Sequence, residues 1–198
     1  MSERLVFAGL FAIGPAVLGG WMLSQSMAFA AEDGPGPNLL IEVGGTTSGT
    51  IVIDLLPDAA PGHVERLATL ARQGDYDGVA FHRVISGFMA QTGDVEFGKG
   101  ADTGRAGMGG SSLPDLKAEF SDVPFDRGVV GMARSQSPDS ANSQFFIMFE
   151  PAPHLNGQYT VVGRVVDGMD VVDAIKLGGG QNGAVTDPDR MVKVTVQD

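Results

Sequence analysis

Apolar residues recur with a helical period in two parts of the chain. The clearer part predicts a helix over residues 61–73, because Pro61 suits a first helical turn and Gly74 is a stop signal. Its apolar stripe, with i, i+3, i+4 and i+7 spacing, consists of Val64, Leu67, Ala68 and Ala71. A shorter helix is expected over residues 169–176, just ahead of a run of glycines.

Short apolar runs bounded by glycine, proline or polar residues fill most of the remaining sequence, and such runs are typical of strands. They predict strands over residues 39–43, 50–55, 81–85, 89–93, 128–133, 144–149, 160–166 and 191–196. No repeat and no second domain are visible. About eight strands and two helices in 198 residues therefore indicate one mainly β domain, an antiparallel barrel without exposed sheet edges. Strand number alone does not separate a barrel from a sandwich.

The amino-terminal thirty residues have a different pattern. After Arg4, residues 5–22 carry no charge, and residues 28–30 read Ala-Phe-Ala, which is typical of a signal-peptidase site. Charged residues return directly afterwards, at Glu32. We therefore expect residues 1–30 to be a secretory signal that is removed from the mature protein.

An uncleaved membrane anchor is the alternative for the same segment, because its apolar length is sufficient to span a bilayer. Gly14-Pro15 and Gly19-Gly20 weaken a stable spanning helix. Residues 31–38, which contain Gly-Pro-Gly-Pro, are expected to be a linker, and residues 39–198 the folded domain. The domain is then expected in the periplasm, either free or anchored to the inner membrane and facing the periplasm.

Composition excludes several classes of protein. Hydrophobic residues make up 43% of the chain and charged residues 19%, which is incompatible with a disordered chain. The net charge is −11 and lysine and arginine form no cluster, so a nucleic-acid surface is not expected. The chain has no cysteine, which excludes disulfides, zinc-thiolate sites and cysteine nucleophiles.

Other common sites lack their sequence patterns. The three histidines, His63, His82 and His154, lie far apart, so no metal site is expected, and the serine-hydrolase motif Gly-x-Ser-x-Gly is missing. The glycine-rich residues 98–112 lack the ending of a phosphate-binding loop and predict a surface loop. We expect His82 to be a core histidine hydrogen-bonded to the backbone. A solvated face is expected for the acidic residues Asp94, Glu96, Asp115 and Glu119.

Arg83 has unusual surroundings, because its neighbours in sequence are mostly large and apolar. A guanidinium in such a position must reach solvent or find hydrogen-bond acceptors. Gln91 and Gln144 lie in similarly apolar runs, so one polar cluster could satisfy all three side chains. The alternative is an arginine that extends to the surface. A dry apolar pocket with one cationic donor is the chemistry that this set favours.

Residues 81–94, Phe-His-Arg-Val-Ile-Ser-Gly-Phe-Met-Ala-Gln-Thr-Gly-Asp, resemble the signature of the cyclophilin-type peptidyl-prolyl cis-trans isomerases. Residues 131–133, 142–147 and 155–157 follow in the order of that family, and the resemblance extends from about Leu39 to Val196. It implies a closed eight-stranded antiparallel β-barrel capped by two α-helices. Together with the expected export signal, it implies a bacterial, exported isomerase.

The resemblance also implies roles for individual residues. Arg83, Gln91 and Phe88 would be catalytic, with Arg83 directed at the proline nitrogen and Gln91 orienting Arg83. The substrate-binding residues would be Met89, Ala133, Arg134, Gln144, Phe146, His154, Leu155 and Tyr159. Among them, Met89, Phe146 and Leu155 would enclose the proline ring with Phe88. The backbone of Arg134 would pair with the substrate residue before proline, and Gln144 would support the groove.

Two positions depart from the best-known eukaryotic pattern. His154 stands where those proteins have a tryptophan, and Tyr159 where they have a histidine. Tight cyclosporin binding in the family depends on that tryptophan, so weak cyclosporin binding is expected here. The expected partners are proline-containing peptides and unfolded exported proteins, without a cofactor, and the chain is expected to be a monomer. The alternative function is a peptide-binding chaperone of the same fold whose catalysis is incidental.

Overall fold

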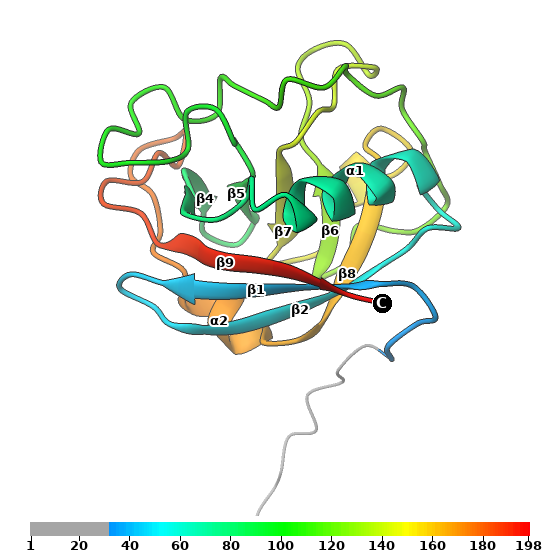
Figure 1. Cartoon of the computed structure of the whole chain (residues 1–198), viewed down its shortest axis with the longest axis horizontal. Helices are drawn as coiled ribbons and strands as arrows, with labels where there is room; N and C mark the ends of the chain where they lie inside the picture. Colours follow the sequence, from blue (N-terminus) through cyan, green and yellow to red (C-terminus); the bar gives the residue numbers. More distant parts are fainter. Residues whose placement is uncertain (1–31) are drawn as a thin grey trace, which may run out of the picture.

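The computed structural model describes residues 32–198 (Figure 1). The signal or anchor expected over residues 1–30 lies outside the described residues. The strands are β1 (Asn38–Gly44), β2 (Gly49–Leu55), β3 (Val79–Ala80), β4 (Arg83–Ile85), β5 (Met89–Thr92), β6 (Val129–Met132), β7 (Phe145–Met148), β8 (Val161–Asp167) and β9 (Arg190–Gln197). The helices are α1 (Pro61–Arg72), the 3₁₀ helix η1 (Pro153–Leu155) and α2 (Met169–Ala174). None of the helices in residues 32–198 has the length and apolar character that crossing a membrane requires.

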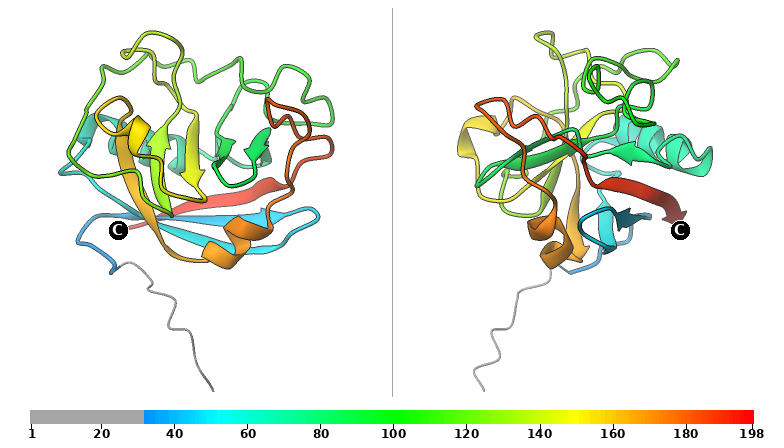
Figure 2. Two further views of the ribbon diagram at one scale, coloured as in Figure 1. Left: turned by 180° about the vertical axis from the view of Figure 1, so that it is seen from behind. Right: turned by 90° about the vertical axis from the view of Figure 1, so that its left-hand side faces the viewer.

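The strands form one antiparallel sheet of nine strands, in the order β3-β9-β1-β2-β8-β6-β7-β5-β4. The sheet curls strongly into a half-barrel, which Figure 2 shows from behind and from the side. Its edge strands, β3 and β4, are separated in sequence only by Phe81 and His82, so the chain itself joins the two edges. The predicted mainly β fold with two α-helices is confirmed. The expected closed eight-stranded barrel differs from the structure in strand number and in closure.

The difference arises where one strand was expected over residues 81–85. β3 pairs with β9, whereas β4 pairs with β5, and Phe81 and His82 connect these two ladders. The apolar pattern did not reveal this division, because Phe81 and His82 are buried like the strand residues around them.

Loops cover the outer sides of both edge strands. On β3, the backbone N–H of Ala80 donates to the carbonyl of Gly98 at 2.9 Å. On β4, the N–H of Val84 donates to the carbonyl of Gly183 at 2.8 Å, and the Val84 carbonyl accepts from the N–H of Gly178 at 2.9 Å. The outward-facing backbone groups of these residues are therefore already paired.

The two helices lie on opposite sides of the part of the sheet that contains β1, β2 and β9 (Figure 1). α1 lies above β9, and all four residues of its predicted apolar stripe are buried. α2 lies below β2 and ends at Ala174, two residues before the predicted end. It stops there because Ile175 has φ −58° and ψ 133°, which is not a helical conformation.

β7 separates two hydrophobic clusters, because successive residues of a strand point to opposite faces. Phe145 and Ile147 belong to the larger cluster inside the curled sheet. Phe146 and Met148 belong to a second cluster on the outer face, which also contains Met89 of β5. The outer face of β5, β7 and β6 is therefore apolar, and this face carries the candidate site.

Candidate functional site

Nine of the eleven predicted site residues line one cavity of about 180 Å³, here called the small cavity. They are Arg83, Phe88, Met89, Gln91, Ala133, Arg134, Phe146, Leu155 and Tyr159. Gln144 lines an adjacent cavity of about 430 Å³, here called the large cavity. The two cavities share Gln91, Ala133 and Arg134 and so form parts of one groove. His154 belongs to the lining of neither cavity.

Aromatic rings form much of the apolar wall of the small cavity. Phe146 stacks on Phe125 with ring centroids 5.8 Å apart and meets Tyr159 edge-on at 5.9 Å. This packing requires Gly131 in β6, because a Cβ atom there would lie 2.6 Å from both phenylalanine rings. Phe146 is only 5% exposed and Leu155 only 8%, so the wall is closely packed as well as apolar.

Phe88 stacks against His154 at the rim of the small cavity. The two rings stack with centroids 6.0 Å apart and planes inclined by 25°. Phe88 itself lines the cavity, whereas His154 is exposed on the short helix η1. His154 therefore contacts the cavity wall from outside.

Arg83 lies half-buried in the cavity wall, with fixed partners for part of its guanidinium. Nε donates to the carbonyl of Asn182 and Nη1 to Oε1 of Gln91, both at 3.1 Å. Nη1 also lies 4.0 Å from the sulfur of Met89. Arg83 forms no salt bridge with a carboxylate in the described part of the chain, and its Nη2 donates to no described residue. The cationic group is thus oriented without being neutralised.

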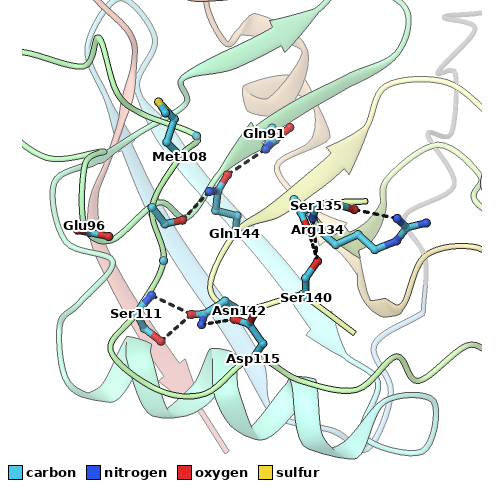
Figure 3. A pocket seen from close by; sticks show the side chains of 14 residues that line it. Gln91, Glu96, Met108, Ser111, Asp115, Arg134, Ser135, Ser140, Asn142 and Gln144 are labelled. Carbon is cyan, nitrogen blue, oxygen red and sulfur yellow. Dashed lines mark hydrogen bonds between the residues drawn. The ribbon is translucent and has the colours of Figure 1, made fainter. Parts of the chain in front are cut away.

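The three polar side chains expected to form one cluster do lie together. Gln91 stands opposite Arg83 in the β4–β5 ladder, and its Nε2 donates to Oε1 of Gln144 at 3.0 Å. Gln144 in turn donates from Nε2 to the carbonyl of Gly109 at 2.8 Å (Figure 3). Each glutamine amide therefore donates one hydrogen bond and accepts another. This arrangement favours the interpretation in which Arg83, Gln91 and Gln144 form one polar cluster over an arginine that extends to the surface.

Arg134 stands at the junction of the two cavities. Its guanidinium lies over the ring of Tyr159, 4.3 Å from the centroid, and donates to the carbonyls of Gln158 and Ser135. Ala133 uses its backbone N–H for the carbonyl of Gln144 at 2.9 Å. The backbone N–H of Arg134 donates to no other residue among 32–198, which leaves it free for a peptide in the groove.

The large cavity is more polar, and sequence analysis missed most of it (Figure 3). Asn142 organises one side: its Oδ1 accepts from the backbone and hydroxyl of Ser111, and its Nδ2 donates to Asp115 at 2.9 Å. Two carboxylates, Glu96 and Asp115, line the cavity. Residues 107–111 also line it, although they belong to the glycine-rich segment for which only a surface loop was expected. The lack of a motif in that segment concealed its position beside the site.

Asp94 is not part of a solvated face, which corrects the expectation for this carboxylate. It is fully buried, and its two oxygens accept four backbone N–H groups from residues 96, 97, 107 and 109. A buried carboxylate is tolerated when such donors surround it. Asp94 therefore holds the glycine-rich segment against β5.

Glu119 also differs from the expected solvated face. Its Oε2 lies 2.6 Å from Nδ1 of the buried His63, and its carboxylate accepts the backbone N–H groups of Gly62 and His63 at the start of α1. Burial raises the pKa of Glu119, but the hydrogen bonds from His63 and from these N–H groups outweigh burial and hold the pKa below its usual value. Glu119 thus caps α1 from a distant loop.

His82 is buried as predicted, and the backbone group that its ring approaches is that of Ala80. This contact falls outside strict hydrogen-bond geometry, so neither ring nitrogen has a well-aligned partner among the described residues. Burial lowers the pKa of His82, opposed by the charge of Asp94. The buried imidazole lies close to Gly107, where an added Cβ would be 3.1 Å from its Nε2.

Residues 39–196 match the family described as cyclophilin type peptidyl-prolyl cis-trans isomerase/CLD. The chain is 63% identical over 153 residues to a probable peptidyl-prolyl cis-trans isomerase of Brucella suis, covering 75% of this chain and 78% of that protein. The fold is similar to a crystal structure of a cyclophilin from Hirschia baltica, with a TM-score of 0.68 and 26% identity, covering 82% of this chain and 74% of that one. A Cryptosporidium parvum cyclophilin type peptidyl-prolyl cis-trans isomerase, crystallised in the presence of the dipeptide Ala-Pro, has a TM-score of 0.69 and 24% identity, covering 81% of this chain and 99% of that one.

Proposed function

This chain belongs to the cyclophilin-type peptidyl-prolyl cis-trans isomerase family and is a peptidyl-prolyl isomerase, and we propose that Arg83 catalyses its reaction by donating to the proline nitrogen. One observation supports this role above others: an oriented guanidinium without a carboxylate partner lies in the wall of an apolar cavity. Such a group can direct a free N–H donor at a substrate atom.

The chemical problem is the stiffness of the amide bond. Resonance makes rotation about an X-Pro bond slow, with a barrier of about 18–20 kcal/mol. In the twisted transition state the proline nitrogen becomes pyramidal and recovers a lone pair. A donor directed at that lone pair stabilises the transition state more than either planar ground state, which is what catalysis requires.

Arg83 suits this task because a guanidinium stays charged and holds its donors in a fixed fork. Lowering the barrier to about 13 kcal/mol would give about 10³ turnovers per second. Neither a nucleophile nor a covalent intermediate is needed. The apolar wall strengthens the contact, because a proline ring against Phe146 and Leu155 excludes water from the guanidinium.

The rest of the groove would hold the peptide on the amino-terminal side of proline. The free backbone N–H of Arg134 would donate to the carbonyl of the substrate residue before proline. Residues further from proline would then reach the large cavity, which adjoins the small cavity along Gln91 and Ala133.

A protease-coupled assay with a proline peptide tests the role of Arg83. Arg83→Ala should lower kcat/KM by about a hundredfold or more, because a preorganised donor is lost. Arg72→Ala is the matched control, since it also removes one arginine, from the exposed end of α1. Activity of Arg83→Ala equal to that of the control would refute the proposed mechanism.

The same variants distinguish the enzyme from a chaperone whose catalysis is incidental. Peptide binding to Arg83→Ala, followed by titration, should weaken much less than kcat/KM falls, because the apolar wall is intact. If client proteins fold equally well with Arg83→Ala and with the unaltered protein, their folding depends on binding rather than on isomerisation.

We place the clients among exported proteins, since the sequence of residues 1–30 has the pattern of a secretory signal. The enzyme would then act in the periplasm. The intact mass of the protein purified from cells tests this: loss of about thirty residues supports a cleaved signal. A full-length mass in the membrane fraction would support the anchor, and a full-length mass in the cytosol would contradict both.

A further inference from the structure

Asp94 has more backbone partners than any local turn needs. Its Oδ1 accepts from the N–H groups of Glu96 at 3.1 Å and Phe97 at 2.8 Å, which closes the turn directly after β5. Its Oδ2 accepts from the N–H groups of Gly107 at 2.7 Å and Gly109 at 2.9 Å. The second pair of bonds fixes a segment that is distant in sequence and lines the groove.

Gly109 connects Asp94 to the polar side chains of the site. Its N–H donates to Asp94, while its carbonyl accepts Nε2 of Gln144 at 2.8 Å. Gln144 accepts from Gln91 at 3.0 Å, and Gln91 accepts from Nη1 of Arg83 at 3.1 Å. Four consecutive hydrogen bonds therefore connect the buried carboxylate to the guanidinium.

The direction of these bonds is determined at both ends. A carbonyl only accepts and a guanidinium only donates, whereas each glutamine amide can turn either way. Because Gly109 presents a carbonyl, Gln144 must turn its NH₂ group toward the loop and its oxygen toward Gln91. Gln91 must then turn its oxygen toward Arg83. A shifted Gly109 would remove one of these two constraints and would leave Gln144 without the acceptor that fixes its position.

We propose that Asp94 is a positioning residue for isomerisation, which fixes the Arg83 fork through Gly109, Gln144 and Gln91. The proposal rests on the proposed function of Arg83 and extends it to a residue that does not line the groove. Asp94 lines neither cavity, and the proposal requires that its effect on kcat pass through Gln144. That dependence separates positioning from a general contribution to stability.

Asp94→Asn tests the proposal with little change in shape. In either orientation of the new amide, its NH₂ group faces two of the four backbone N–H groups, which lose their acceptor. In the otherwise unaltered protein, we expect kcat/KM to fall about tenfold, mainly through kcat, because a small misplacement of a catalytic group is costly. The ¹⁵N–¹H signal of Arg83 Nε should shift at the same time.

The decisive comparison repeats Asp94→Asn in a Gln144→Met background, where the connection is already broken. There the second change should alter kcat/KM by less than about twofold, whereas its effect on the urea midpoint should be the same in both backgrounds. Asp54→Asn is the matched control: Asp54 is equally buried, pairs with Arg164, and has no bond to the glutamines. It should cost stability and leave kcat/KM within about twofold.

Equal losses of activity from Asp94→Asn in both backgrounds would overturn the proposal, and so would full activity of the single variant. If Asp94→Asn does not fold, Gly109→Ala replaces it, because the new Cβ would lie 2.6 Å from Oδ1 of Asp94 and displace the segment. The same dependence on Gln144 is expected. Full activity of Arg83→Ala would instead refute the proposed function, so the two failures are distinguishable.

Discussion

Arg83 and Gln91 are direct partners across the β4–β5 hairpin, and Nη1 of the arginine donates to Oε1 of the glutamine at 3.1 Å. The cation and the amide that orients it therefore come from a single two-stranded ladder. Because the register of a hairpin determines which side chains share a face, the geometry of this pair is set locally.

The fork of Arg83 should matter more than its charge. Arg83→Lys retains the positive charge but has one ammonium group in place of a planar set of donors. It cannot hold Gln91 and Asn182 and still direct a donor at the substrate, so we expect kcat/KM to fall about a hundredfold. Arg72→Lys is the control. Near-normal activity of Arg83→Lys would show that charge alone suffices.

The large cavity should favour basic peptides, because Glu96 and Asp115 line it. For peptides with lysine rather than glutamate two residues before proline, kcat/KM should be up to about fivefold higher, as expected for exposed charge pairs. The preference should disappear in the Glu96→Gln, Asp115→Asn double variant and in about 1 M salt. Asp58→Asn, an exposed acid outside the cavity lining, is the control. An unchanged preference in the double variant would contradict this prediction.

Stability should depend on acid pH through Glu119. Its pKa is held below the ordinary value of 4.5, mainly by His63 and the first N–H groups of α1 acting against burial. The stability that Glu119 contributes is therefore fully present above that value and is lost as the pH falls through the lower folded pKa. Urea midpoints between about pH 6 and pH 3 should fall more steeply for the unaltered protein than for Glu119→Gln. Parallel curves would contradict the assigned capping role.

Cyclosporin should bind weakly, because His154 stands at the rim where tight binders of the family have a tryptophan. His154→Trp should tighten binding by at least about tenfold, since a larger ring adds buried apolar area and an indole donor. Titration of both proteins measures this, with isomerase activity as the check that the groove is intact. Tight binding by the unaltered protein would contradict the prediction.

The sequence predicted α1 well, because one face of that helix is buried and the apolar period shows it. It also placed β7 within a residue at either end, since Phe145–Met148 is buried on both faces and reads as one apolar run. It could not divide residues 81–85, because Phe81 and His82 are as buried outside the ladders as they would be within them. Hydrogen-bond register, rather than burial, decides where those strands begin and end.

The candidate site shows the same limit. Residues of the small cavity could be predicted because they lie in contiguous motifs. Asp94 was wrongly expected on a solvated face, because the sequence does not distinguish a buried carboxylate that accepts backbone N–H groups from one that is exposed to solvent. Residues 107–111 were missed because a glycine-rich sequence indicates a loop but does not show where that loop packs. Its position beside the groove depends on the hydrogen bonds from Gly107 and Gly109 to Asp94.

The covered sheet edges have a consequence for the proposed action on unfolded chains. Free strands of a client could add to an open ladder and extend the sheet, as in donor-strand complexes and fibrils. Here β3 and β4 are two and three residues long and run into one another through Phe81 and His82, with loops already bonded to their outer sides. Such a client would thereby be denied a template for coaggregation, and the proposed groove would be the place where it binds.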